Sequence, residues 1–454
     1  MRPQDVRLPP PMAAQLREHA DALLELGTLG GAAGPGAADA IAELAERLGN
    51  TYPYPDPMYA GQMLKPPAPV AWAAYATAML LNPNNHALDG GPATAEMERE
   101  AVEQLRVMLG VPAPGLGHLA SSGTVANLEA LWVARELTDG ATVLSSAGAH
   151  YTHARMCGVL GIEHEAIPQE DRGRMDVDAL AARMAKGGVG TVVATVGTTS
   201  IGALDDAAAI ADLCEQHGAR LHVDTAYGGF FALLADGGEP GVAAGPYGAI
   251  ARADSVVIDP HKHGLQPYGC GCVLFADPDV GRLYAHDSPY TYFTSPDPRE
   301  EHSRTLSGEH RTDAVHLGEI SLECSRAGAS AAALWTTLRA LPLTRDGLGA
   351  GLADCRAAAL AMARRLDADE RVELLVEPEL DIVCVLARGA DPTAAAEHAF
   401  ASLAQDGWHV ATLRTDRGTA LRCCLLKPEH LGVVDRLADA ITAALAPQHR
   451  RHSS

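Results

Sequence analysis

The chain has few aromatic side chains (4%), fewer basic than acidic residues and no long apolar run among its 454 residues. The formal charge of −22 argues against nucleic acid or an anionic membrane as a partner, because both bind basic surfaces. No stretch of about 18 apolar residues occurs, so no transmembrane helix is expected. The first residues show no apolar core followed by a cleavage site, so no signal peptide is predicted. We therefore expect a soluble, cytoplasmic protein.

The nine cysteines follow no framework spacing, which favours a reducing compartment over a disulfide scaffold. Cys270 and Cys272 are too isolated for a zinc site. The trio His150, His153 and Cys157 has helical spacing but lacks a carboxylate or a further ligand. No metal site is therefore predicted, and His153 is interpreted as an exposed histidine on a helix.

The chain is longer than the size at which single cores usually stop growing, so two domains are expected. We predict a helical and proline-rich N-terminal arm (1–85), a large domain (86–335) and a small C-terminal domain (336–454). In the arm, residues 52–69 contain too many prolines for regular structure and must run extended. Such an arm is expected to pack on a neighbouring domain or on a partner subunit.

Short β-rich runs alternate with helical stretches from about residue 92 to residue 275. The runs lie at 142–144, 191–196, 221–223 and 255–258. This alternation is typical of the α/β class, in which helices cover both faces of a mostly parallel sheet. After about residue 340 the pattern changes to apolar runs within 371–389, 407–416 and 420–428, followed by an amphipathic helix. The C-terminal part is therefore expected to be a smaller α+β domain.

Polar clusters follow several of the predicted strands, where open parallel sheets bind ligands. Small residues at a helix start (Ser122, Gly123 and Thr124) expose free backbone N–H groups suited to phosphate, although taken alone they are more often a plain N-cap. Asp224 directly follows an apolar strand, where a buried carboxylate needs a cation or a donor. These clusters predict one site at the carboxyl edge of the sheet.

Lys262 follows another apolar strand and lies between two histidines. A lysine that is removed from water loses proton affinity and becomes a nucleophile toward carbonyls. An anion-binding turn, an aspartate, a histidine and such a lysine together describe a cradle for pyridoxal 5′-phosphate (PLP).

The ordered segments "SSGTVAN", "AHYT", "GTT", "HVDTAYGG" and "DPHK" resemble the group II PLP-dependent amino acid decarboxylases, over roughly residues 50–340. The resemblance implies a fold type I enzyme, with a large domain built on a mostly parallel, seven-stranded type of sheet and a smaller C-terminal domain. It also implies a homodimer with the site at the subunit interface and an amino acid as substrate.

Residue by residue, the resemblance implies that Lys262 forms the Schiff base with PLP and that Asp224 pairs with the pyridine nitrogen. His150 is similar to the histidine that stacks on one face of the ring, and Ala226 packs against the other face. The remaining cofactor contacts implied are Ser122, Gly123, Thr124, Thr199 and His261. His263 stands where relatives often carry an aromatic or a small residue, and we interpret it as tuning the site.

The substrate side is less defined. Tyr290 and Tyr292 lie where the family has a mobile loop with a catalytic tyrosine, and either is a candidate proton donor. In the unusual segment "NNHALDGG", His86 and Asp89 are candidate substrate contacts. Arg422 is interpreted either as a ligand of the substrate carboxylate or as a surface arginine. The polar segment 296–313 is interpreted as a solvated loop rather than a lid.

The leading hypothesis is an L-amino acid decarboxylase that acts through an external aldimine and releases CO2 and an amine. The alternative keeps PLP and breaks another bond, as a C–S β-lyase or a decarboxylation-coupled oxidative deaminase acting on a specialised-metabolite amino acid or a cysteine conjugate. A PLP-binding protein without catalysis is a third reading, which the presence of Lys262, Asp224 and His150 argues against.

Overall fold

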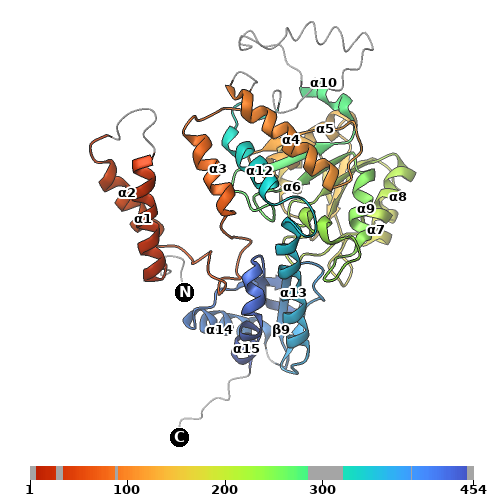
Figure 1. The fold of residues 1–454 in the computed structure, drawn as a ribbon. Coiled ribbons are helices and arrows are strands. Elements are labelled where there is room, and N and C mark those ends of the chain that lie inside the picture. The colour runs from red at the N-terminus through yellow and green to blue at the C-terminus, as the bar shows by residue number, and fades with distance from the viewer. Residues whose placement is uncertain (1–6, 27–33, 87–89, 285–320, 390, 447–454) are drawn as a thin grey trace.

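A computed structural model describes residues 7–26, 34–86, 90–284, 321–389 and 391–446 of the chain (Figure 1). Three predicted site residues (Asp89, Tyr290 and Tyr292) and the 296–313 segment lie outside the described residues. None of the described helices combines the length and the apolar character needed to cross a membrane.

A seven-stranded sheet forms the centre of the molecule, with the order β1-β7-β6-β5-β4-β2-β3. Its strands are β1 (Leu116–Ala120), β2 (Thr142–Ser146), β3 (His164–Ile167), β4 (Val189–Thr195), β5 (Arg220–Asp224), β6 (Ser255–Ile258) and β7 (Gly271–Phe275). Only β7 runs antiparallel to its neighbours within this sheet. β4, β6 and β7 are buried almost throughout, because helices cover both faces. The predicted α/β class with a mostly parallel sheet is confirmed.

Helices cover this sheet and share the main core with its strands. They are α4 (Pro92–Met108), α5 (Gly123–Leu137), α6 (Thr152–Leu160), α7 (Val177–Met184), α8 (Ala207–His217), α9 (Ala244–Gly248), α10 (Gly281–Tyr284) and α12 (Gly328–Ala340). Two of them begin at aspartate N-caps, since Asp176 and Asp206 accept hydrogen bonds from the backbone N–H groups of the first turns of α7 and α8. α5 packs on β7, β6 and β1, and α8 packs on β4 and β5.

A second, antiparallel sheet has the order β10-β11-β9-β8. It consists of β8 (Val372–Leu374), β9 (Ile382–Ala387), β10 (Ala411–Thr415) and β11 (Gly418–Cys424), with helices α13 (Leu348–Asp367), α14 (Pro392–Gln405) and α15 (Val434–Leu445). One apolar cluster lies between this sheet and its helices. Side chains such as Ile382 and Cys384 belong instead to the main core, so the two sheets share a continuous apolar contact.

The N-terminal residues form α1 (Pro10–Leu26), α2 (Ala37–Leu48) and α3 (Pro69–Met79). α1 and α2 pack mainly against each other, and Figure 1 shows this hairpin projecting away from the body of the molecule. Residues 52–68 contain no helix and only an isolated bridge, from Tyr59 to His409, as the proline content predicts. Lys427 fixes this extended segment, because its ammonium group donates to the carbonyls of Tyr54, Asp56 and Tyr59.

Candidate active site

The carboxyl ends of five strands meet at one edge of the large sheet. β1 leads into Ser122 and α5, β2 into the turn before His150, and β4 into the turn that carries Thr199. β5 ends at Asp224, and β6 is followed by Lys262. Because β1 and β6 both run antiparallel to β7, β1 points the same way as the parallel strands. The alternation of strands and helices thus brings together segments that are up to about 140 residues apart in the sequence.

One cavity of about 180 Å³ lies at this edge. It is lined by Ser122, Gly123, Thr124, Asn127, His150, Thr152, Thr195, Gly197, Thr199, Asp224, Ala226, Tyr227, Asp259, His261 and Lys262. Every residue predicted to contact the cofactor belongs to this lining. The structure therefore brings the whole predicted cofactor set together in one place.

The start of α5 forms one end of the cavity. Ser122 is the N-cap, and its hydroxyl accepts a hydrogen bond from the backbone N–H of Val125 at 3.2 Å. Gly123 is the first residue of the helix, and a Cβ built on it would lie 2.5 Å from Oδ2 of Asp259. Only glycine fits here without displacing that carboxylate. The helix start, with its positive dipole end and free N–H groups, is suited to an anion.

Lys262 lies in the cavity wall beside Asp259 and His261. Its Nζ lies 3.2 Å from Oδ2 of Asp259, and its side chain is 19% exposed. Nε2 of His261 lies 3.4 Å from the same oxygen, while its Nδ1 lies 2.8 Å from the carbonyl of Cys270. Burial lowers the pKa of His261, which favours its neutral form. Asp259 is therefore the main partner of the lysine.

Asp224 also lines the cavity and is buried, with 5% exposure. Its Oδ1 accepts the backbone N–H of Ala226 at 2.9 Å, and its Oδ2 lies 3.0 Å from Nε2 of His153. Burial alone raises the pKa of Asp224, but these hydrogen bonds and the Lys262 charge outweigh it and hold the pKa well below its ordinary value. The carboxylate is thus ionised and faces the cavity.

His150 is half-buried in the turn after β2, and its Nδ1 lies 2.6 Å from the hydroxyl of Thr152. Burial lowers the pKa of His150, so the ring is expected to be neutral near pH 7. Ala226 offers only a methyl group to the same cavity. A neutral flat ring and a small side chain are suited to enclosing a planar cofactor ring.

His153 was predicted to be exposed, and that prediction is wrong. Its side chain is fully buried and bonds to Asp224. The sequence did carry a signal, because His153 is three and four positions from Met156 and Cys157, which share the buried face of α6.

The reading of Arg422 as a surface arginine is also wrong, since it is 5% exposed. Its Nε and Nη2 donate to the carbonyls of Ser200 and Thr199 at 2.7 and 2.6 Å. Arg422 is therefore positioned to hold the turn after β4, and it does not line the cavity. His86 does not line this cavity within its own chain either.

Six lining residues were not among the predicted site residues: Asn127, Thr152, Thr195, Gly197, Tyr227 and Asp259. Asn127 donates to the carbonyl of Gly123 and accepts from Nε2 of His222, both at 2.8 Å. Burial lowers the pKa of His222 to about 3, so it is neutral. The sequence did contain a signal for Asp259, because this residue directly follows β6 and precedes Lys262 by three positions.

His263, interpreted as tuning the site, points elsewhere. It is fully buried, with its Nε2 3.4 Å from Oδ2 of Asp381, a residue next to β9 of the smaller sheet. Tyr227 donates to the other oxygen of Asp381 at 2.6 Å. Tyr227, which lines the cavity, is thus joined through Asp381 to the smaller sheet.

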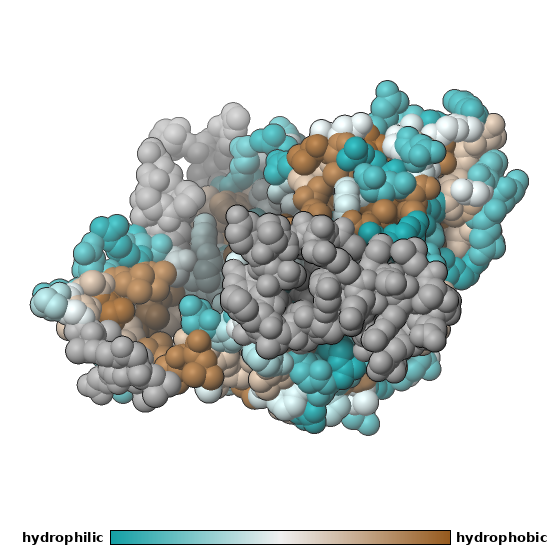
Figure 2. Space-filling model, turned by 90° about the horizontal axis from the view of Figure 1, so that it is seen from above, coloured by the Kyte–Doolittle hydropathy of each residue, from teal (hydrophilic) through white to brown (hydrophobic). Residues whose placement is uncertain are grey.

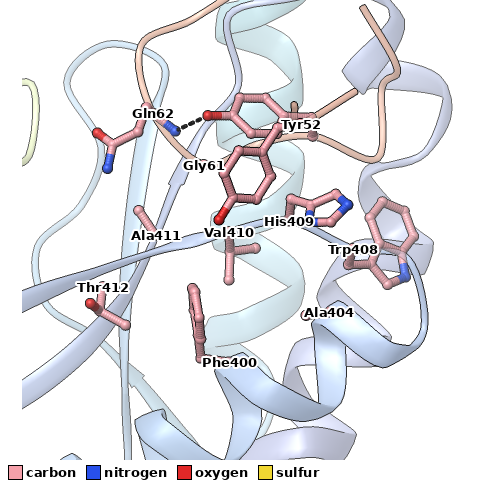
Figure 3. A pocket seen from close by; sticks show the side chains of 11 residues that line it. Tyr52, Gly61, Gln62, Phe400, Ala404, Trp408, His409, Val410, Ala411 and Thr412 are labelled. Atoms are coloured by element: carbon pink, nitrogen blue, oxygen red, sulfur yellow. Dashed lines mark hydrogen bonds between the residues drawn. The ribbon is translucent and has the colours of Figure 1, made fainter. Parts of the chain in front are cut away.

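A second cavity, of about 220 Å³, lies between the N-terminal arm and the smaller sheet (Figure 3). Tyr52, Phe400, Trp408 and His409 form much of its wall. Its lining contains no carboxylate, lysine or thiol. This cavity lacks the groups that a PLP site needs.

The groups that line the first cavity match those that PLP needs. It offers an amine for the aldehyde, a helix start for the phosphate and an ionised carboxylate for the pyridine nitrogen. An orphaned buried atom adds to the fit: among the described residues, Oδ1 of Asp259 has no hydrogen-bond partner. The fold and this site define a PLP-dependent enzyme of fold type I.

Comparison with known proteins gives the family. Residues 70–388 match the pyridoxal-dependent decarboxylase conserved domain, and the chain belongs to this family. A probable L-aspartate decarboxylase from Halobacterium salinarum is 32% identical over 362 residues, covering 78% of this chain and 87% of that protein. The L-2,4-diaminobutyrate decarboxylase of Rhizobium meliloti is 31% identical, covering 82% and 75%.

Solved structures agree on the fold. Mouse CSAD in its apo form superposes with a TM-score of 0.78 at 22% identity, over 94% of this chain and 92% of that chain. Oryza sativa TDC with PLP and tryptamine superposes with a TM-score of 0.78 at 20% identity, over 97% of this chain and 93% of that chain. The protein is therefore a PLP-dependent amino acid decarboxylase, and the decarboxylase hypothesis is supported over the β-lyase and oxidative deaminase alternatives.

Proposed function

We propose that the cavity at the carboxyl edge of the large sheet is the decarboxylation site, with Lys262, Asp224 and His150 as its catalytic groups. The observation that carries this proposal is the convergence of all the predicted cofactor contacts on one lining. Tyr290 and Tyr292 remain candidate proton donors, and Asp89 and His86 remain candidate substrate contacts.

PLP, when bound, withdraws electrons from the Cα of the amino acid, so that the carboxylate leaves as CO2. Lys262 is the amine in the lining that can bind the cofactor covalently. Its Nζ must be unprotonated to attack an aldehyde, and Oδ2 of Asp259, at 3.2 Å, is placed to accept that proton. The start of α5 binds the phosphate through its N–H groups.

Asp224 would keep the pyridine nitrogen of bound PLP protonated, because its carboxylate remains ionised in the buried site. His150 lies in the turn after β2 and restricts the position of the ring. Arg422 acts indirectly, since it holds the turn that carries Thr199. Each role follows from an atom that already faces the cavity or supports its wall.

The test is product analysis with wild type, Lys262→Ala and, as control, Lys186→Ala, an exposed lysine two residues after the end of α7. Substrates are L-aspartate, L-tyrosine and L-2,4-diaminobutyrate, which the relatives' names suggest. We expect wild type and K186A to release CO2 and amine in equal amounts from at least one of these substrates. K262A should lose the visible absorbance of bound PLP. Retention of that absorbance by K262A overturns the assignment of the lysine.

The enzyme is further proposed to be a homodimer. The α1–α2 hairpin projects from the body and exposes Leu23, Leu44 and Leu48, with 39%, 47% and 46% exposure. Figure 2 shows apolar surface at the left of the molecule, where this hairpin lies. α3 adds Trp72, which is 45% exposed. Apolar faces of this kind are favoured at subunit contacts, because each buried leucine contributes about 1.5–3 kcal/mol.

Light scattering over a range of protein concentrations tests the dimer. The double substitution Leu44→Glu and Leu48→Glu should shift the mass toward the monomer at low concentration, because it places two charges on the apolar face of α2. The matched control is Leu431→Glu, a leucine of similar exposure (42%) beside the smaller sheet. A wild-type monomer, or equal masses for all variants, contradicts the proposed contact.

Two further sequence predictions remain proposals. A division between a large and a small domain is supported by the two separate sheets, although the proposed boundary at residue 335 falls within α12 and the apolar cores are continuous. A cytoplasmic location is supported by nine cysteines that are all free, most of them buried.

A further inference from the structure

Asp224 has a partner whose role is not explained by packing. His153 comes from the first turn of α6, and Asp224 ends β5, 71 positions later in the chain. Their atoms Nε2 and Oδ2 are 3.0 Å apart, with the histidine side chain 0% exposed and the aspartate side chain 6% exposed. A buried histidine is costly unless it is hydrogen-bonded, so this contact must form whenever the protein is folded.

The position of the ring proton follows from the surroundings. Among the described residues, Nδ1 of His153 has no hydrogen-bond partner. A proton on Nδ1 would therefore be buried without an acceptor, whereas a proton on Nε2 has the carboxylate in line. The other rings nearby do not compete, because His222 bonds to Ser255 and Asn127, and His164 bonds to Ser145. His153 thus donates to Asp224 through Nε2.

This hydrogen bond leaves Asp224 free to serve the cavity. Ala226 N–H occupies Oδ1 and His153 occupies Oδ2, with one bond each. A carboxylate offers about four lone-pair directions, so acceptor capacity remains on the side that faces the cavity. The two donors fix the plane of the carboxylate.

We propose that His153 is the positioning residue of Asp224, holding its carboxylate in the orientation and charge state that binds the ring nitrogen of PLP. The inference rests on the proposed role of Asp224. His153 does not line the cavity, so it acts only through that carboxylate.

Two substitutions of similar shape separate the hydrogen bond from packing. His153→Gln keeps an N–H donor near the place of Nε2, and His153→Met fills the same space without a donor. The control is His164→Gln, a histidine of the neighbouring strand that bonds to Ser145 rather than to Asp224. The readouts are the PLP dissociation constant of the apoprotein and the position of the absorbance band of bound PLP between pH 6 and 9.

We expect H153M to raise the dissociation constant by about 10- to 100-fold, since a hydrogen bond to a charged group is being removed. H153M should also shift the band or its pH dependence, while H153Q and H164Q stay within about fivefold of wild type. Equal behaviour of H153Q and H153M, whether both bind normally or both fail to fold, assigns His153 a packing role and overturns the proposal.

Asp224→Asn separates the two proposals. If D224N binds PLP as tightly as wild type, the role of Asp224 fails, and the inference fails with it. If D224N loses PLP while H153M does not, the inference about His153 alone is wrong.

Discussion

Gly123 offers the sharpest test of the cofactor cradle, because one added methyl group meets a buried charge. In Gly123→Ala the new Cβ would lie 2.5 and 2.6 Å from the two oxygens of Asp259 and 2.9 Å from its Cγ. Ordinary contacts begin at 3.4 Å, so the carboxylate must move by about 1 Å. Asp259 is 3% exposed and holds Lys262 at 3.2 Å, so it has little room to do so.

The magnitude follows from the cost of overpacking. Inserting a methyl group into a packed interior costs about 1–3 kcal/mol, and we expect the free energy of unfolding of G123A to fall by about this amount. Movement of Asp259 also disturbs Lys262, so the PLP dissociation constant should rise at least about tenfold, which corresponds to about 1.4 kcal/mol.

The matched control is Gly158→Ala in the interior of α6. Gly158 is exposed, and a Cβ there has nothing within 4 Å. G158A should raise the free energy of unfolding by about 0.5–1 kcal/mol through helix propensity, with no change in PLP affinity. Urea unfolding of the apoproteins and PLP titration measure both effects. If G123A is as stable as G158A and binds PLP like wild type, the cradle described here is refuted.

Two more changes probe the supports of the site. Arg422→Lys replaces a fork that binds two carbonyls by a single ammonium group, so the turn carrying Thr199 loosens and the PLP dissociation constant should rise about tenfold. An unchanged constant in PLP titration contradicts that support. Burial raises the pKa of Asp381 to about 6 from 3.8. The stability contributed by its protonated form is therefore complete below about pH 4 and is lost as the pH rises through 6. Asp381→Asn stays neutral, so relative to wild type its free energy of unfolding should gain about 2–3 kcal/mol between pH 4 and pH 8. Urea unfolding at both values measures this gain, and a pH-independent difference rules out a buried charge.

Much of the site was predictable because it depends on local signals. Lys262, Asp224 and the "SSGT" turn each lie at or shortly after the end of an apolar strand, and parallel strands bring their carboxyl ends to one edge. The mostly parallel sheet was predictable from the alternation of apolar runs and helical stretches. The extended arm was predictable from its prolines, which prevent regular structure whatever lies around them.

The contacts behind the site were not predictable in the same way. The burial of His153 depends on how α6 packs on its neighbours, and the hydrogen bonds of Arg422 depend on how the smaller sheet meets the turn after β4. The link from Tyr227 to Asp381 also joins residues of different sheets, 154 positions apart.

The sequence by itself therefore determined which residues reach the candidate site, since a strand end and a helix start are set by neighbouring residues. Only the tertiary structure decided which partners hold those residues in place. A buried polar side chain must be satisfied by whatever group packing brings to it, and packing is a property of the whole chain.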